Sequence, residues 1–357
     1  MSGELSDEQL RSIFTEDVRP YVESQRLLAT GGRSWPPVLV YTGGQPGAGK
    51  SRANERVSQL RPSLVPVVGD DLRRFHPDYA RLMREDPLGM PAATAQASGQ
   101  WIGMAAEYLR EQRADVLIEA TLRSPAAMAS TIAAFREAGY VVELRAVAVP
   151  GEVSRLSTVE RYTGQVAASG AGRWTPAASH DEAFEQAPRT VEELVAAGAV
   201  DRFVVEDRAG AILTDMSFFG FRDDVLRGVA REAAEAFDQA RGVDKMSTAQ
   251  AREWLDLAQM QVGRLAALRV RDADLLHTIE RVATVDAAAV AGTAFPGDAD
   301  RRRAVTEKLT DAAARVVRAP RQIERRRASD SAYGGSAPST GPFMGPQSAG
   351  WGGPGLS

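Results

Sequence analysis

The residues with the clearest chemical meaning form a glycine-rich loop, Gly44-Gln45-Pro46-Gly47-Ala48-Gly49-Lys50-Ser51. Glycine permits positive φ and carries no Cβ, so successive backbone N–H groups can converge on phosphate oxygens at the start of a helix. In such a loop the lysine ammonium reaches the β- and γ-phosphates of a nucleotide, and the serine hydroxyl holds Mg²⁺. The spacing therefore predicts a phosphate-binding P-loop, with Lys50 on the phosphates and Ser51 as the metal ligand.

An ordinary glycine-rich turn that happens to contain a lysine is the alternative interpretation. The composition argues against it, because only three of the 43 basic residues are lysines (Lys50, Lys245 and Lys308). A lysine is thus seldom placed anywhere in this chain, and its position inside a glycine loop favours a functional role.

A pair of carboxylates follows the next apolar run, in Val67-Val68-Gly69-Asp70-Asp71. Ligands of open α/β sheets bind at the carboxyl ends of the strands, so these acids are expected to face the nucleotide. A carboxylate there can accept the proton of an attacking hydroxyl group. Either acid could instead be the N-cap of a short helix over Leu72–Phe75, and the two roles can coexist, one for each residue.

The elements that position these residues alternate between strand and helix. Val38–Tyr41 predicts a short buried strand before the loop, and Ser51–Leu60 predicts a helix after it. Further strands are predicted at Val65–Val68, Val116–Glu119, Val141–Val149 and Phe203–Val205, separated by helical patterns. This alternation predicts an α/β fold with a mostly parallel sheet flanked by helices.

The pattern changes after about residue 220. Residues 221–328 are rich in Ala, Leu and Arg and predict a helical annex without strands, in contrast to a kinase-like domain over residues 1–220. The annex helices are expected at Asp223–Arg241, Ala249–Val270, Asp272–Ala291 and Asp298–Val317. Residues 329–357 are rich in Gly, Ser and Pro and predict a disordered tail, because they contain too little aliphatic surface to offset the entropy of ordering.

The composition narrows the chemistry further. The chain has no cysteine and three histidines, which excludes a disulfide framework, a thiolate metal site and a histidine cluster. No run of about 18 apolar residues occurs and no signal peptide is visible, so we expect a cytoplasmic protein without a membrane span. The net charge of −4 argues against a nucleic-acid footprint over the whole chain.

Several ordered motifs together resemble those of the zeta toxins. They are the glycine loop, the segment from Gly69 to Tyr79, the segment Ile118-Glu119-Ala120-Thr121-Leu122-Arg123, the segment Thr158–Tyr162, and Arg173-Trp174-Thr175-Pro176 followed by His180-Asp181. The resemblance covers roughly Leu5 to Phe218.

The resemblance implies an ATP- and Mg²⁺-dependent P-loop kinase that phosphorylates the 3′-hydroxyl of the amino sugar in UDP-N-acetylglucosamine. Such a protein blocks cell-wall synthesis and is usually the toxin of a toxin–antitoxin pair, so a small helical antitoxin is an implied partner. By motif position Asp70 is similar to the catalytic base, and Thr121 and Arg123 to substrate-contacting residues. Arg161 and Arg173 match the arginines that clamp the transferring phosphate.

Physical reasoning supports the arginine assignments. Phosphoryl transfer spreads negative charge over the equatorial oxygens, and an arginine fork stabilises that charge without losing its proton. Arg173 lies in the small-residue stretch 167–174, which is expected to act as a mobile lid, whereas Arg161 lies on a helical pattern. Without the motifs, any single arginine of this chain would be read as a solvated surface residue.

Glu119 ends the apolar strand Val116–Ile118, and two roles stay open for it. It could hold a metal-bound water in the manner of a Walker-B acid, or it could position Thr121 and Arg123. His76 and His180 are interpreted as structural hydrogen-bonding residues. Counting back from Glu119, the glutamate that contacts the sugar in the family is replaced by Gly103, which leaves other hydroxyl acceptors open: another nucleotide sugar, a nucleoside or an antibiotic.

The end of the annex is strongly basic. Residues 301–327 contain ten basic and three acidic residues, which fits an electrostatic partner such as nucleic acid, an anionic membrane or an acidic protein. Solvated helix ends are the interpretation we favour, because the segment has amphipathic helical spacing and no interleaved aromatic residues. A nucleotide switch or ATPase with a partner-binding annex is the remaining alternative to a kinase.

Overall fold

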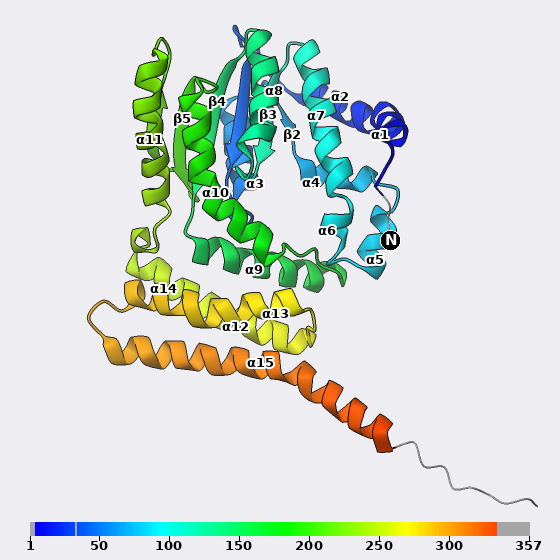
Figure 1. Cartoon of the computed structure of the whole chain (residues 1–357), viewed down its shortest axis with the longest axis vertical. Coiled ribbons are helices and arrows are strands. Elements are labelled where there is room, and N and C mark those ends of the chain that lie inside the picture. The colour runs from blue at the N-terminus through cyan, green and yellow to red at the C-terminus, as the bar shows by residue number, and fades with distance from the viewer. Residues whose placement is uncertain (1–3, 33, 334–357) are drawn as a thin grey trace, which may run out of the picture.

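The structure is a computed structural model that describes residues 4–32 and 34–333, with side chains described as far as Arg318. It contains an α/β body and a layer of helices beneath it (Figure 1). The predicted tail at 329–357 falls mostly outside the described residues, but α15 (Ala299–Tyr333) continues helically through its first five positions.

The sheet of the described residues has six strands in the order β2-β3-β1-β4-β5-β6. All neighbours pair in parallel except β5 and β6, which form an antiparallel hairpin. The mostly parallel sheet predicted from the sequence is thus confirmed, but β6 was missed because its residues are largely exposed and show no apolar run. The strands are β1 (Val38–Gly43), β2 (Leu64–Val67), β3 (Asp115–Ala120), β4 (Val141–Ala148), β5 (Arg202–Asp207) and β6 (Ile212–Ser217).

Helices cover the two faces of the sheet unequally. Alternate strand residues such as Leu39 and Tyr41 join one large core with the helices of the first face, while Val40 joins a small core with α3 on the other. The longer helices on the large core are α1 (Asp7–Ile13), α2 (Arg19–Leu28), α7 (Ala95–Glu111), α8 (Pro125–Glu137), α10 (Ala177–Ala196) and α11 (Asp223–Ala240), and the short α4 (Gly69–Leu72) adds Leu72. Helix α3 (Lys50–Leu60) covers the second face.

Ion pairs replace apolar packing on part of the α3 face. Glu143 and Arg145 on β4 are buried and lie 2.8 Å apart, and Arg145 reaches Glu206 on β5 at 2.9 Å. Arg56 and Arg61, from α3 and the residue after it, complete the network at 2.8 and 2.7 Å from Glu206 and Glu143. Each buried charge therefore has an opposite partner, which is the condition for placing charges under a sheet.

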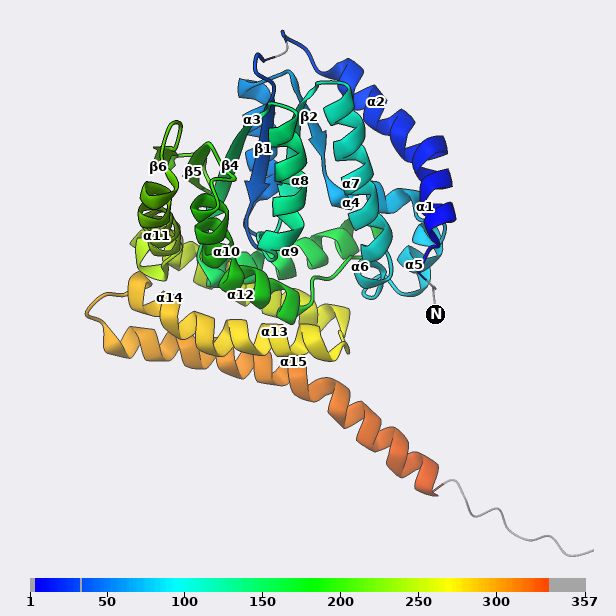
Figure 2. The same cartoon turned by 45° about the horizontal axis from the view of Figure 1, so that its top comes forward.

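The annex begins later than the sequence suggested. Leu226, Ala230 and Phe237 of α11 pack in the core of the sheet, although the sequence placed this helix in the annex. A second core starts with the short turn Val243–Lys245 and contains α12 (Thr248–Leu268), α13 (Ala273–Arg281), α14 (Ala287–Ala294) and α15. We use "annex" below for residues 243–318. In two views α9 (Gly151–Ser169) lies between the sheet and α12 (Figure 2).

The basic stretch of the annex falls on α15. Leu309, Ala313 and Val316 of this helix are buried against the annex core, so one face of the helix packs and the other carries the arginines. The side chains of its last basic residues, after Arg318, lie outside the described residues.

Candidate functional site

The glycine loop leaves the central strand β1 and ends where α3 begins at Lys50. Gly47 and Gly49 have φ of 81° and 97°, a region that glycine adopts without strain. A methyl group at Gly47 would overlap the carbonyl oxygen of Ser154 on α9. The loop therefore lies so close to α9 that only glycine fits, and the N–H groups of the first turn of α3 point toward the space in front of it.

Hydrogen bonds from two of its own side chains fix the conformation of the loop. The buried Gln45 side chain donates to the carbonyl of Val149 at 2.8 Å and to the hydroxyl of Ser154 at 3.1 Å. Lys50 Nζ donates to the carbonyls of Gly44 and Gln45 at 2.8 and 3.2 Å. Gly44, Gln45 and Ala48 thus shape the loop, and the loop residues that line the cleft are Pro46, Gly47, Gly49, Lys50 and Ser51.

Lys50 and Glu119 face each other at the base of the cleft. The Nζ atom of Lys50 lies 3.8 Å from Oε1 of Glu119, whose other oxygen accepts from Asn54 at 3.0 Å. Burial lowers the pKa of Lys50, and the charges of Glu119 and Asp70 oppose that shift. Among the described residues Glu119 makes polar contacts with Lys50 and Asn54 and no hydrogen bond or ion pair with Thr121 or Arg123.

Asp70 lies in the first turn of α4 (Gly69–Leu72), in the cleft across from the P-loop. Its carboxylate accepts from Arg73 at 3.0 Å and pairs with Arg173 at 2.9 Å. Burial alone would raise the pKa of Asp70, but Arg173, Arg73 and Arg161 outweigh it and hold the pKa below its ordinary value. The carboxylate is therefore ionised near neutral pH and able to accept a proton.

The predicted N-cap role of these acids is wrong. Val68 is the N-cap residue of α4, and it makes no side-chain capping bond. Asp71 instead is exposed and lies 3.8 Å from Arg74. The helix begins at Gly69, three residues before the expected Leu72, so both acids lie inside its first turn, where their charge still favours the helix dipole.

Arg161 and Arg173 meet at the rim of the cleft from different elements. Arg161 extends from α9, and Arg173 lies in the segment between α9 and α10. Arg161 donates to the hydroxyl of Thr175, and the Nε atoms of both arginines are buried without an acceptor among the described residues. Burial and the proximity of Arg173 lower the pKa of Arg161. Two half-buried cations with spare donors form a site that an anion would stabilise.

The cleft between these groups has a volume of about 720 Å³. Thr121 and Arg123 line it beyond Glu119, and Arg123 lies 3.5 Å from Glu182. The wall opposite the P-loop is small and mostly apolar, and α7 contributes Ala95, Ser98, Gly99 and Ile102 to it. Gly103, the position that the sequence assigned to the family's sugar contact, is exposed and does not line the cleft.

Comparison with known proteins is consistent with this geometry. The zeta toxin family model matches residues 28–217, which is more than half of the chain. The chain belongs to the zeta toxin family. The matched region contains every predicted site residue and ends within β6, before α11 and the annex.

Relatives of this zeta toxin family member include the toxin PezT of Streptococcus pneumoniae serotype 4, which is 31% identical over 159 residues. That match covers 44% of this chain and 63% of PezT, just under two thirds of its length. Toxin zeta of Streptococcus pyogenes is 22% identical over 210 residues, which are 58% of this chain and 71% of the relative. A solved chain from the PezAT chromosomal toxin–antitoxin system of S. pneumoniae aligns with a TM-score of 0.51 and 22% identity, over 66% of this chain and 98% of that one.

Arg208 is a site residue that the sequence reasoning for this family member missed. It lies on the turn between β5 and β6, donates to Ser157 on α9 at 2.9 Å, and packs against Gly49 of the P-loop. Burial and the neighbouring charge of Arg52 lower its pKa. The position of Arg208 directly after β5, at the carboxyl edge of the sheet, was the signal that could have identified it.

The two histidines of the zeta toxin motifs make structural contacts. His76 Nδ1 accepts from the backbone of Asp78 at 3.1 Å. His180 lies 2.9 Å from Ser154 Oγ and 2.9 Å from Asp181, an arrangement with the order of a Ser-His-Asp triad. Ser154 and His180 are almost fully buried, so no substrate reaches the hydroxyl, and the contacts instead support the P-loop through Gln45.

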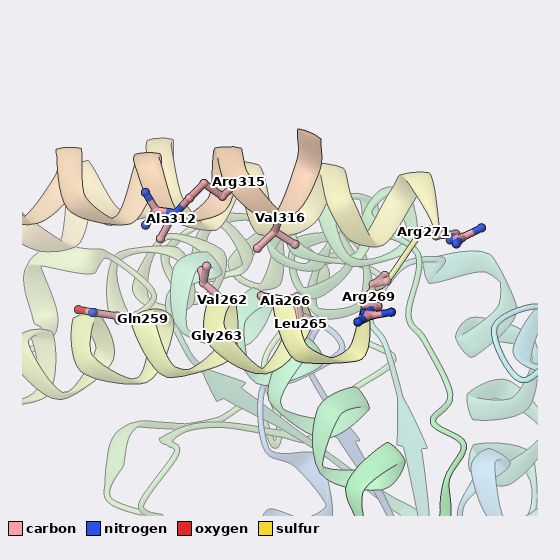
Figure 3. A pocket seen from close by; sticks show the side chains of 11 residues that line it. Gln259, Val262, Gly263, Leu265, Ala266, Arg269, Arg271, Ala312, Arg315 and Val316 are labelled. Atoms are coloured by element: carbon pink, nitrogen blue, oxygen red, sulfur yellow. The ribbon is translucent and has the colours of Figure 1, made fainter. Parts of the chain in front are cut away.

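A second cavity of this zeta toxin family member lies in the annex, between α12 and α15 (Figure 3). It has a volume of about 550 Å³ and a mostly apolar floor, and its charged lining residues are Arg269, Arg271 and Arg315. It contains neither a carboxylate nor a nucleophile, so the cleft at the P-loop is the candidate active site. Over the described residues, no group of three or more acidic or histidine side chains gathers as a metal cage, and no helix is long and apolar enough to cross a membrane.

Proposed function

We propose that this protein is an ATP-dependent kinase that transfers the γ-phosphoryl group to a hydroxyl of a small molecule, with UDP-N-acetylglucosamine as the leading acceptor. The observation that carries the proposal is the placement of Asp70. Its carboxylate lies in one cleft with the P-loop Lys50 and with Arg161 and Arg173. A nucleotide switch needs a phosphate cradle, but it has no use for a proton acceptor on the far side of that cradle.

In the proposed reaction, Asp70 accepts the proton of the acceptor hydroxyl while the hydroxyl oxygen attacks the γ-phosphorus. The bond from the γ-phosphorus to the bridging oxygen breaks, and ADP leaves. Lys50 and the two arginines stabilise the charge that develops on the transferring group. Arg173 pairs with Asp70 in this structure, and arrival of the γ-phosphate would offer it a second anion, which frees Asp70 for the acceptor.

The residues present fit a magnesium ion. Mg²⁺ usually keeps several waters and takes one or two protein ligands together with substrate phosphates, so a cage of acids is not required. Ser51 is exposed at the cleft and would hold the ion, and Glu119 would hold one of its waters. When bound, the ion neutralises the charge of the β- and γ-phosphates.

The lining of the cleft supports a substrate that carries its own phosphates. Arg73 and Arg123 line the cleft together with Thr121 and Ser98. Two guanidinium groups suit the diphosphate of a nucleotide sugar, and the hydroxyl groups suit a sugar ring. The absence of a carboxylate from the α7 portion of the lining is the observation that favours a second candidate, a kinase of another hydroxyl acceptor.

The test is incubation with ATP, Mg²⁺ and UDP-N-acetylglucosamine, followed by mass spectrometry of the sugar nucleotide. We expect a mass gain of one phosphate that requires Lys50, with Lys50→Ala as the negative control. If ATP binds and the sugar nucleotide gains no phosphate, the sugar assignment is wrong. A panel of nucleotide sugars, nucleosides and aminoglycosides under the same conditions then decides between the candidates.

Asp70→Asn separates the kinase from a nucleotide switch. The amide keeps the shape of the side chain but cannot accept the proton, so we expect transfer to fall by about 10²- to 10⁴-fold while ATP affinity changes little. A switch would keep its hydrolysis rate in this variant, and that result would refute the kinase proposal.

We further propose a small helical antitoxin as a partner, because PezT belongs by its description to a toxin–antitoxin system. A toxic kinase should arrest growth on expression, and Lys50→Ala should abolish that arrest. If growth arrest persists in this variant, the toxicity does not depend on nucleotide chemistry.

A further inference from the structure

The annex shares a hydrophobic core with α9, which carries Arg161, and with the residues between α9 and α10, which contain Arg173. We call these residues, 170–176, the arginine segment. Leu156 and Val159 of α9, and Trp174 of the segment after it, pack in one cluster with residues of α12, α13 and α14. Arg173 immediately precedes Trp174. The annex therefore lies directly against the arginine segment, although the zeta toxin family match ends before the annex begins.

One polar contact fixes this packing. The indole Nε1 of Trp174 donates to the carboxylate of Asp274 on α13 at 2.6 Å, and the backbone N–H of Ala177 donates to the same carboxylate at 3.0 Å. Trp174 is only 3% exposed and packs edge-on against Tyr162 of α9. Asp274 thus binds both the buried tryptophan and the first turn of α10, on either side of residues 175 and 176.

Apart from Trp174, the arginine segment is held by a few contacts: Ser169 Oγ donates to the carbonyl of Ala171 at 3.0 Å, and Thr175 accepts from Arg161. The segment begins with Gly170-Ala171-Gly172, which have no large side chains to pack. The backbone of Arg173 donates to Gln165 at 3.0 Å, and its guanidinium pairs with Asp70 at 2.9 Å. Gly172 packs against α9, where an added methyl group would overlap the carbonyl oxygen of Tyr162, but no large side chain of residues 170–172 anchors the segment, so the direction of Arg173 depends on its neighbour Trp174 being fixed. The segment expected to be a lid is therefore anchored at one end by the annex.

We propose that Asp274 is a positioning residue for Arg173, and that the annex is an integral part of the active site. The kinetic consequences rest on the proposed kinase function, whereas the conformational consequence does not. In the apo protein, Asp274 holds the segment so that Arg173 reaches the cleft before nucleotide binds. Such preorganisation limits how far the guanidinium must move to meet the transferring phosphate.

Attachment of the annex to the rest of the chain does not depend on Asp274 alone. Arg155 of α9 donates to both oxygens of Asp286 at 2.8 and 2.7 Å, and Arg281 pairs with Asp181 of α10 at 2.9 Å. These contacts join the annex to α9 and α10 independently of Trp174. A variant at Asp274 can therefore release the arginine segment without detaching the annex.

The test compares Asp274→Ala with Asp272→Ala. Both residues lie at the N-terminus of α13. Asp272 caps α13 by accepting from Leu275 at 2.9 Å, and over the described residues it makes no hydrogen bond or ion pair with the arginine segment. Trp174→Phe is a second variant that keeps an aromatic ring against Tyr162 but removes the indole donor. Each variant is measured alone and in an Arg173→Ala background, for kcat, for ATP affinity and for the thermal midpoint.

We expect Asp274→Ala and Trp174→Phe to lower kcat by about 10- to 100-fold, with ATP affinity nearly unchanged. In the Arg173→Ala background neither should lower kcat further, because the group that they position is gone. The control Asp272→Ala should lower the thermal midpoint but leave kcat intact. An Asp274→Ala effect on kcat that persists undiminished without Arg173, or no effect in either variant, would overturn the proposal.

Tryptic cleavage supplies a measurement that needs no enzymatic activity. Trypsin cuts after Arg173, and the fragment that begins at Trp174 is identified by mass spectrometry. We expect this fragment to form faster in Asp274→Ala and in Trp174→Phe than in the wild-type protein or Asp272→Ala. Equal rates of cleavage after Arg173 in the wild-type protein and the three variants would refute the anchoring. If the cleavage pattern is as expected but the wild-type protein transfers no phosphoryl group, only the proposed function is refuted.

Discussion

Substitution of Gly47 by alanine is the most direct perturbation of the nucleotide site. Two costs follow from the structure. The backbone at Gly47 has φ of 81°, which is disfavoured for alanine by about 1–2 kcal/mol. The new methyl group would also overlap the carbonyl oxygen of Ser154 on α9. A backbone atom cannot rotate away as a side chain can, so the loop itself must move by about an ångström to restore an ordinary contact distance.

That displacement should affect binding and catalysis more than stability. The loop presents its N–H groups to the phosphates, and a misplacement of about 1 Å can cost about 100-fold in rate. We therefore expect kcat/KM to fall by roughly that factor and ATP affinity to weaken with it. Strain of about 1–2 kcal/mol should lower the thermal midpoint by only a few degrees in a chain of this size. Isothermal titration with ATP and thermal unfolding measure the two effects separately.

Gly164→Ala is the matched control. Gly164 lies in the interior of α9, has no atom within 4 Å of the position of an added methyl group, and does not have positive φ. Alanine there should stabilise the helix by up to about 1 kcal/mol and leave ATP affinity unchanged. If Gly47→Ala bound ATP within about threefold of the wild type, the close approach of the loop to α9 would not constrain the phosphate site, and the reasoning would fail.

Two further predictions concern charge. Arg208→Ala should weaken ATP binding by about tenfold or more, because a charge-assisted hydrogen bond contributes about 1.5–3 kcal/mol. Arg208→Lys should lose less affinity. Equal affinity in both variants and the wild type would exclude Arg208 from the nucleotide site. Arg145 and Arg61 outweigh burial and hold the pKa of Glu143 below its unfolded value, so its contribution to the free energy of unfolding is complete above about pH 4.5 and is lost as the pH falls further. Urea unfolding measures the free energy of unfolding, which should fall less between pH 7 and pH 3 in Glu143→Gln than in the wild type. An equal fall in both proteins would contradict this.

The annex changes how the predicted lid is understood. Small residues before Arg173 suggested a segment free to move, and that expectation rested on local flexibility alone. The buried Trp174 and its bond to Asp274 oppose free movement at one end. The two residues are 100 positions apart in the sequence, so nothing in the local pattern around Arg173 indicated the anchor.

The same limit explains the other differences between sequence and structure. Helix α11 shows the Ala- and Arg-rich amphipathic pattern of the annex helices, and the pattern does not say which surface its apolar face will meet; Leu226 and Phe237 meet the sheet. Strand β6 shows no apolar alternation because it forms an exposed edge. Arg208 looks like one of many arginines until the turn after β5 brings it against Gly49.

The local chemistry of the site can be predicted from contiguous patterns in the sequence. The order of strand, glycine loop and helix around Lys50 is a contiguous feature, and so is the position of Asp70 after the next strand, because both depend on backbone geometry within a few residues. The distant side chains that complete the site become evident only in the folded chain. Burial under other elements lowers the pKa of Lys50 and Arg161, three arginines brought close by the fold lower the pKa of Asp70, and the packing of the annex set the position of Arg173. These effects depend on the distances between residues that are far apart in the sequence, and a local sequence pattern does not give those distances.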